Sequence, residues 1–158
     1  MFKLQSPSFF YNGDGMASEK NLKRLQREYW RRLTGELIDY YPEFRPKKGN
    51  GNTYYLPLGN KSARVSMSVN SIMGIQECRI IISNRPHLYN YLERNKEHIE
   101  KGINIKLTWE YMSDAKSYIF IFRDFDIRNE DSWDEAIKWH LKMASTLYFE
   151  FSMWISSY

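Results

Sequence analysis

The sharpest cluster of ionisable side chains follows an apolar run and consists of Arg123, Asp124 and Asp126. Two carboxylates beside a guanidinium can bind a divalent metal ion or share a proton, and either property would serve hydrolysis. The same residue types are common in turns, where Asp accepts hydrogen bonds from backbone N–H groups and Arg forms an ion pair. We expect the structural role here and keep a nuclease-associated enzyme that uses this cluster as an alternative.

The other residues that could support catalysis form no familiar pattern. His87, His98 and His140 have no Cys or second His at metal-ligand spacing, and the sequence lacks a G-x-S-x-G elbow, a Walker loop and a dinucleotide-binding glycine motif. We therefore predict no catalytic residue, no metal site and no cofactor. His140 falls on the apolar stripe of the last predicted helix, so we expect it to form hydrogen bonds inside the core. Cys78 is the single cysteine and lies in an apolar run, which predicts a buried thiol and a reducing, cytoplasmic compartment.

Basic residues gather in the first part of the chain and indicate an anionic partner. Residues 1–92 contain 14 Lys or Arg and 7 Asp or Glu, whereas residues 93–158 contain 9 and 12. No acidic residue occurs from Phe44 through Arg64, a stretch that begins with a Gly-rich loop. Such a surface attracts phosphate chains by counterion release, and Tyr54 and Tyr55 could add base stacking. The candidate nucleic-acid-binding residues are Arg45, Lys47, Lys48, Asn50, Asn52, Lys61 and Arg64.

Two further interpretations compete with nucleic-acid binding. The first predicted helix is also basic, but charged helix faces are commonly just solvated. The last predicted helix ends in the aromatic run 148–158, which could form a homodimer or protein-interaction surface or could pack into the chain's own core. The sequence leaves these alternatives open. The basic residues of the first helix are Lys20, Lys23, Arg24, Arg27, Arg31 and Arg32.

The helices that must position these residues follow from apolar spacing. Apolar residues recur at three- and four-residue steps from Leu22 to Tyr40, with Ser18 as the expected N-cap and Pro42 as the stop. A second helix is predicted from Pro86 to a stop at Gly102. Ser132 is expected to cap a closing helix, whose predicted buried positions are Trp133, Ala136, Ile137, His140, Leu141, Ala144, Leu147, Tyr148 and Phe151.

The strands are predicted from β-prone runs separated by turn residues. Ala63, Val65, Met67 and Val69 alternate with polar residues, which is the pattern of a sheet with one buried face and one available face. The order reads α-β-β-β-α-β-β-α, an α+β fold in which an antiparallel sheet of about five strands packs against long helices. We expect an irregular N-terminal arm over 1–17 and a single domain over 18–158. The predicted strands are 54–58, 63–70, 75–83, 104–111 and 117–123.

Membrane insertion is excluded by composition. Charged residues make up 27% of the chain, and the mean hydropathy is -0.64. No apolar run reaches the roughly 18 residues that span a bilayer.

Three short motifs occur in order along the chain. Gln26-Arg-Glu-Tyr-Trp30 lies on the first predicted helix, and Leu56-Pro-Leu-Gly59 precedes the alternating strand. The run from Tyr118 through Arg123 to Asp126 is followed by an acidic link and by Trp133 and Trp139. Over about residues 22–155 this arrangement resembles the prokaryotic family catalogued as domain of unknown function 4268.

The resemblance implies a context rather than a reaction. Members of that family often follow a nuclease-like domain of the PD-(D/E)XK type, in proteins associated with restriction or mobile-element defence. This sequence has no Glu/Asp-x-Lys triplet on a predicted strand, which argues against a nuclease role for it unless a separate chain supplies the nuclease. Our leading hypothesis is therefore a non-catalytic accessory module that contacts nucleic acid through the basic loop and hairpin. The expected partners are nucleic acid, a nuclease or other defence protein, and a second copy of the chain, but no membrane.

Overall fold

A computed structural model describes residues 14–59 and 61–158 of the chain. It confirms the predicted α+β class and, in outline, the predicted order of elements. The elements are α1 (Asp14–Tyr40), β1 (Lys47–Lys48), β2 (Thr53–Pro57), β3 (Ala63–Asn70), β4 (Ile75–Ser83), α2 (Pro86–Arg94), α3 (Lys96–Ile103), β5 (Thr108–Ser113), β6 (Lys116–Asp124), the 3-10 turn η2 (Glu130–Ser132) and α4 (Trp133–Ser156).

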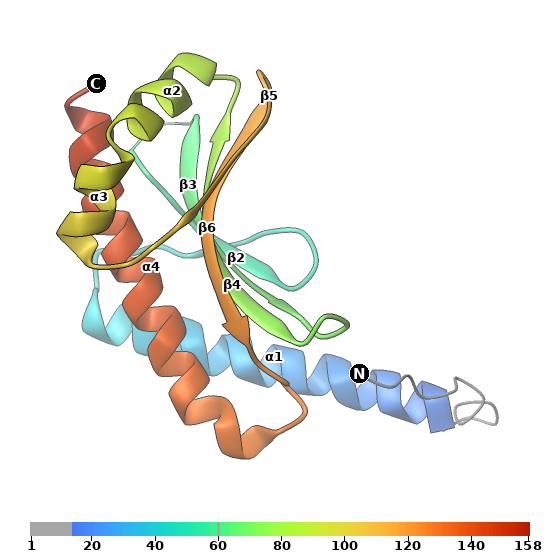
Figure 1. Cartoon of the computed structure of the whole chain (residues 1–158). Helices are drawn as coiled ribbons and strands as arrows, with labels where there is room; N and C mark the ends of the chain where they lie inside the picture. The colour runs from blue at the N-terminus through green and yellow to red at the C-terminus, as the bar shows by residue number, and fades with distance from the viewer. Residues whose placement is uncertain (1–13, 60) are drawn as a thin grey trace.

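The strands form one antiparallel sheet in the order β1-β2-β3-β4-β6-β5. All four described helices lie on the same side of this twisted sheet, and α1 and α4 cross beneath it (Figure 1). Side chains alternate between the two faces, so Val65, Cys78 and Ile119 are buried against the helices. The opposite face of the sheet carries no described helix (Figure 1).

The sheet has six strands among the described residues, one more than the sequence predicts. The additional strand, β1, lies inside the segment expected to be an exposed loop. Its two residues pair with β2, Lys47 opposite Tyr55 and Lys48 opposite Tyr54. A strand this short has no periodicity of its own, and it forms because β2 offers an edge.

The second predicted helix is two helices. Asn95 lies between α2 and α3, where its side-chain Nδ2 donates a 2.8 Å hydrogen bond to the carbonyl of Tyr91. That carbonyl would otherwise accept the helical N–H of Asn95, so the side chain competes with the helix. The predicted stop at Gly102 is also displaced, because α3 continues to Ile103 and ends at Asn104 in the left-handed conformation, with φ of 57°.

Two predicted N-caps differ from the structure. Helix α1 already includes Asp14, four residues before Ser18, and residues 1–13 of the predicted arm lie outside the described residues. Ser132 precedes α4 as predicted, but its Oγ donates to the carbonyl of Asn129 at 2.7 Å and does not cap the helix. The fourth predicted strand, which is β5, begins at Thr108 rather than Asn104, because Asn104 ends α3 and an irregular segment follows it.

A buried polar cluster joins α1, β4 and α4. The Tyr29 hydroxyl lies 2.7 Å from His140 Nδ1, and His140 Nε2 lies 3.2 Å from the carbonyl of Glu77. Because a carbonyl only accepts, Nε2 carries the proton and Nδ1 accepts from Tyr29. Burial lowers the pKa of His140 to about 4. The predictions of a hydrogen-bonded core His140 and a buried Cys78 are both confirmed.

Candidate nucleic-acid interface

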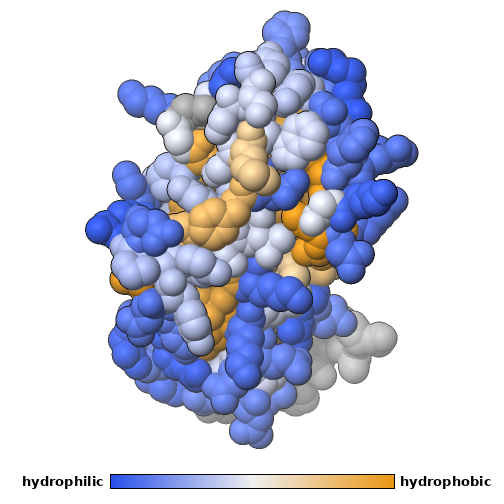
Figure 2. Space-filling view, turned by 90° about the vertical axis from the view of Figure 1, so that its left-hand side faces the viewer, coloured by the Kyte–Doolittle hydropathy of each residue, from blue (hydrophilic) through white to orange (hydrophobic). Residues whose placement is uncertain are grey.

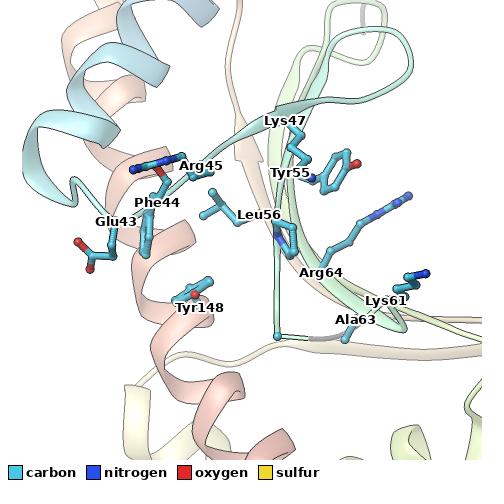
Figure 3. Close-up of a pocket in the computed structure, with 12 residues that line it drawn as sticks. Glu43, Phe44, Arg45, Lys47, Tyr55, Leu56, Lys61, Ala63, Arg64 and Tyr148 are labelled. Atoms are coloured by element: carbon cyan, nitrogen blue, oxygen red, sulfur yellow. The ribbon is translucent and has the colours of Figure 1, made fainter.

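The predicted basic site contains a cavity of about 620 Å³ between the β1–β2–β3 edge of the sheet and the segment that follows α1. Its inner wall is apolar and includes Phe44, Leu56 and Tyr148, with Tyr148 contributed by α4 (Figure 3). Phe44 and Tyr148 hold this wall together, with ring centroids 4.6 Å apart. The cations of the rim are Arg45, Lys47, Lys61 and Arg64, four of the seven predicted residues.

The cationic side chains of this cavity differ in whether the protein itself already binds them. Arg45 is committed to the backbone, because its Nη1 donates to the carbonyls of Pro42 and Phe44. The side chains of Lys47 and Lys61 form no ion pair or hydrogen bond among the described residues, and the Arg64 guanidinium lies 4.7 Å from the Tyr55 ring centroid. We therefore regard Lys47, Lys61 and Arg64 as the cations available to a ligand.

One acidic residue, Glu43, also lines the cavity. It lies at the end close to α1, whereas Lys61 and Arg64 extend from the hairpin on the other side (Figure 3). The carboxylate therefore leaves the hairpin cations unneutralised.

A second cavity, of about 780 Å³, lies on the helix side of the same sheet edge. Four cations line it, Lys23, Arg27 and Arg31 from α1 and Lys48 from β1, and no acidic residue does. Its aromatic wall consists of Trp30 and Tyr54, with ring centroids 5.0 Å apart. Lys48 donates a 2.8 Å hydrogen bond to the carbonyl of Gly51, and its Nζ lies 5.5 Å from the Tyr54 ring centroid.

The two predicted asparagines have different surroundings. Asn52 is structural, since its Oδ1 accepts from Trp30 Nε1 and its Nδ2 donates to the Val69 carbonyl at 3.1 Å. Asn50 is exposed and lines a shallow third cavity of about 280 Å³ on the open face of the sheet. The seven predicted residues therefore do not share one surface, because the sheet edge divides them between its two faces.

The α1 residues of the second cavity were not among the predicted site residues. Lys23, Arg27 and Arg31 stand four residues apart, which places them on one helix face. That spacing could have identified the basic stripe on α1, but it could not show that the stripe lies beside β2. The cavity exists because Trp30 of α1 packs on Tyr54 of β2, a contact between distant parts of the sequence.

The Arg123 cluster has structural contacts. Arg123 Nη2 lies 3.1 Å from Glu135 Oε1, and Asp126 Oδ1 accepts a 3.0 Å hydrogen bond from the N–H of Arg128. The expected ion pair and Asp turn are thus confirmed for Arg123 and Asp126. Within residues 14–59 and 61–158, no three His, Cys, Asp or Glu side chains are grouped closely enough to hold a metal ion.

Comparison with known proteins gives a family but no close relative. Neither the curated proteins nor the solved structures yield a match to this sequence. Among the described helices, none combines the length and apolar character required to cross a membrane. The model of the family described as Domain of unknown function (DUF4268) matches residues 25–154, which are most of the chain, and the protein therefore belongs to this family.

Proposed function

We propose that this domain is a non-catalytic module that binds nucleic acid by its phosphate backbone, as an accessory part of a nuclease-containing defence or mobile-element system. The accessory context rests on the resemblance described above. The binding activity rests on the basic edge, defined as Lys23, Arg27, Arg31, Lys47, Lys48, Lys61 and Arg64.

The observation that carries the proposal is the excess of cations around the two adjoining cavities. Four cations line the second cavity, and of these Arg31 is ion-paired with Glu28, which does not line it. The first cavity adds three cations that lack an acidic partner among the described residues. Cations spread over a concave surface concentrate positive potential, which raises the rate and affinity of phosphate-chain binding. Phosphate contacts carry no sequence information, so we expect sequence-tolerant binding.

The test neutralises the centre of the basic edge. In the quadruple variant, Gln replaces Lys47, Lys48, Lys61 and Arg64. Each lost phosphate contact reduces the slope of log K against log salt by about 1, so we expect the variant to flatten the slope by roughly 3 to 4. Fluorescence anisotropy with labelled duplex and single-stranded oligonucleotides over a salt series measures both affinity and slope.

The matched control changes net charge equally at another place. Gln replaces Arg94, Lys96, Lys101 and Lys142, which are exposed on α2, α3 and α4. This control should retain the parent's affinity and salt slope. Equal binding by the parent and by the Lys47, Lys48, Lys61 and Arg64 variant would overturn the proposal.

A second candidate function, self-association through α4, has a specific observation behind it. Phe149 and Met153 are 44% and 60% exposed and stand one helical turn apart. The helix side of the molecule shows apolar side chains in short stretches between hydrophilic ones (Figure 2). Light scattering of the Phe149→Ser/Met153→Ser variant tests this candidate, which requires a parent dimer and a monomeric variant.

A further inference from the structure

The face of the sheet opposite the helices carries aromatic and basic side chains, although no described helix covers it. Strand alternation assigns Tyr55 of β2, Arg64 and Ser66 of β3 and Arg79 of β4 to this face. On β6 the corresponding residues are Lys116, Tyr118, Phe120 and Phe122. Phe122 is 51% exposed; it pairs with Glu77 of β4, while β5 ends its pairing with β6 at Phe120.

These side chains form a row across the strands. Lys47 pairs with Tyr55, Tyr55 with Ser66, Ser66 with Arg79, and Arg79 with Phe120. Neighbouring strands are about 4.8 Å apart, so the row from Lys47 to Phe120 extends over roughly 19 Å. Cations and rings thus share a line that crosses the sheet at right angles to its strands.

Contacts on this face orient the planar groups, which are half-buried except for exposed Phe122. The Arg79 guanidinium lies 4.5 Å from the Tyr118 ring centroid and 4.6 Å from that of Phe120. Glu77 fixes this orientation by accepting hydrogen bonds from Arg79 Nε at 2.9 Å and Nη2 at 2.8 Å. Phe122 stacks beside Phe120 with centroids 6.4 Å apart and an interplanar angle of 24°.

The charges are unevenly distributed over the face. Its β1–β3 part carries Lys47 and Arg64 and no acidic residue, whereas Glu77, Glu110 and Asp124 lie on β4, β5 and β6. The cavity of about 280 Å³ lies over β2, β3 and β4, between the basic and the acidic part of the face. Asn50, Ser66 and Ser68 are among its polar lining residues. A polyanion is therefore favoured along β1–β3, and flat uncharged groups are favoured towards β6.

We propose that this open face is a stacking platform for single-stranded nucleic acid. Lys47 and Arg64 contact its phosphates, while bases stack on Tyr55, Phe122 and the guanidinium of Arg79. The inference rests on the proposed function and specifies the ligand, because a duplex hides its base faces and cannot use the platform. A protein partner would favour a continuous apolar centre, but here the rings alternate with cations and hydroxyls.

The test separates stacking from charge. The variant Tyr55→Leu/Phe122→Leu removes two rings without changing charge, and Arg79→Lys retains the charge but loses the planar surface. The control Tyr40→Leu/Tyr158→Leu removes two exposed rings elsewhere, with Tyr40 71% exposed at the end of α1 and Tyr158 49% exposed after α4. The probes are a labelled oligothymidylate of about 20 nucleotides and a mixed-sequence duplex of the same length, titrated over a salt series.

We expect the ring variant to bind the oligothymidylate at least about tenfold more weakly, since each stacked base contributes roughly 1 to 3 kcal/mol. Its salt slope and its duplex affinity should remain those of the parent. Arg79→Lys should show the same selective loss, and the control should show none. If the ring variant and Arg79→Lys bind the oligothymidylate as the parent does, the platform is wrong.

Failure of the stacking platform and failure of the proposed phosphate binding give different results in these experiments. If the quadruple cation variant loses binding while the ring variants do not, phosphate binding holds and the platform fails. If the quadruple variant retains binding, the proposed function fails first. A measurement on the unmodified protein covers the case of a misfolded variant: ultraviolet cross-linking of an oligonucleotide that contains 5-iodouracil should attach peptides of β2 and β6. Cross-links confined to the helices would overturn the proposal.

Discussion

Lys47 and Lys48 are consecutive in the chain but lie on opposite faces of the sheet, because Lys47 pairs with Tyr55 and Lys48 with Tyr54. Lys47 consequently lines the cavity with Lys61 and Arg64, whereas Lys48 lines the cavity with Arg27 of α1. Two lysines that are adjacent in the sequence therefore line two different cavities.

This separation predicts how neutralising substitutions combine. The free-energy effects of Lys47→Gln and Arg27→Gln on duplex binding should add to within about 0.5 kcal/mol, because the residues are on different faces. Lys48 and Arg27 line one cavity, so the effects of Lys48→Gln and Arg27→Gln should deviate from additivity by more than about 0.5 kcal/mol in the double variant. Anisotropy titrations of the single and double variants measure both cycles. Strong coupling in the Lys47 cycle would show that the two cavities act as one site.

The elements with local periodicity were predictable. The stripe of α4 from Trp133 through His140 to Phe151 is buried as expected, with only Tyr148 of the predicted set half-buried. The buried face of β3 is also confirmed, since Val65 and Met67 are fully buried, but Ser66 of the opposite face is buried as well. In both cases the side chains needed for the prediction lie within the element itself.

The features that define the candidate site depend on contacts between distant residues. Strand β1 exists through pairing with Tyr54 and Tyr55, and without it the opposite orientations of Lys47 and Lys48 could not be inferred. The second cavity depends on Trp30 packing against Tyr54. Charge composition pointed to this part of the chain, but the pairing of strands decides which of its cations line the same cavity.

His140 predicts a dependence of stability on pH. Its pKa is about 4 in the folded protein and 6.5 when unperturbed, so the unfolded chain binds the proton more readily. The free energy of unfolding is then highest above pH 6.5 and falls as the pH decreases towards 4. The difference between the two pKa values corresponds to a loss of about 3 kcal/mol in the free energy of unfolding, which is complete once the pH is below the folded-state pKa.

Urea unfolding at several pH values measures this effect. His140→Gln can keep one acceptor and one donor but cannot titrate, so its stability should fall less between pH 6.5 and 4. His98→Gln is the control, because His98 is exposed on α3. An identical acid dependence in the parent and in His140→Gln would exclude His140 as the source.

Glu100 predicts a stabilising connection between α3 and β5. Its Oε2 accepts hydrogen bonds from the N–H of Leu107 and from Trp109 Nε1, each at 2.9 Å. Burial alone would raise the pKa of Glu100, but these donors outweigh it and the pKa is lowered. Its stabilisation is therefore present at neutral pH and decreases as the carboxylate is protonated in acid.

Two substitutions distinguish the charge of Glu100 from its hydrogen bonds. Glu100→Ala leaves both donors unpaired and should lower the free energy of unfolding by roughly 1 to 3 kcal/mol. Glu100→Gln keeps an acceptor oxygen and should lower it by less. Exposed Glu97, which is also on α3, provides the control Glu97→Ala. Equal stability of the Glu100→Ala and Glu97→Ala variants would show that the connection contributes nothing.

The end of α4 predicts that truncation and surface substitution have different consequences. Phe151 is fully buried and its ring lies 6.3 Å from that of Trp109, whereas Phe149 and Met153 on either side of it are exposed. Deletion of residues 149–158 removes Phe151 and should lower the free energy of unfolding by at least about 3 kcal/mol. Phe149→Ser/Met153→Ser keeps Phe151 but removes the ring contacts of Phe149 with Tyr41 and Phe44, so it should lower the free energy of unfolding by clearly less than the deletion does. Thermal unfolding of both proteins checks this, and equal stabilities would contradict it.

Because truncation damages the core, a change in oligomeric state after deletion would not identify an interface, and only the surface variant can do so.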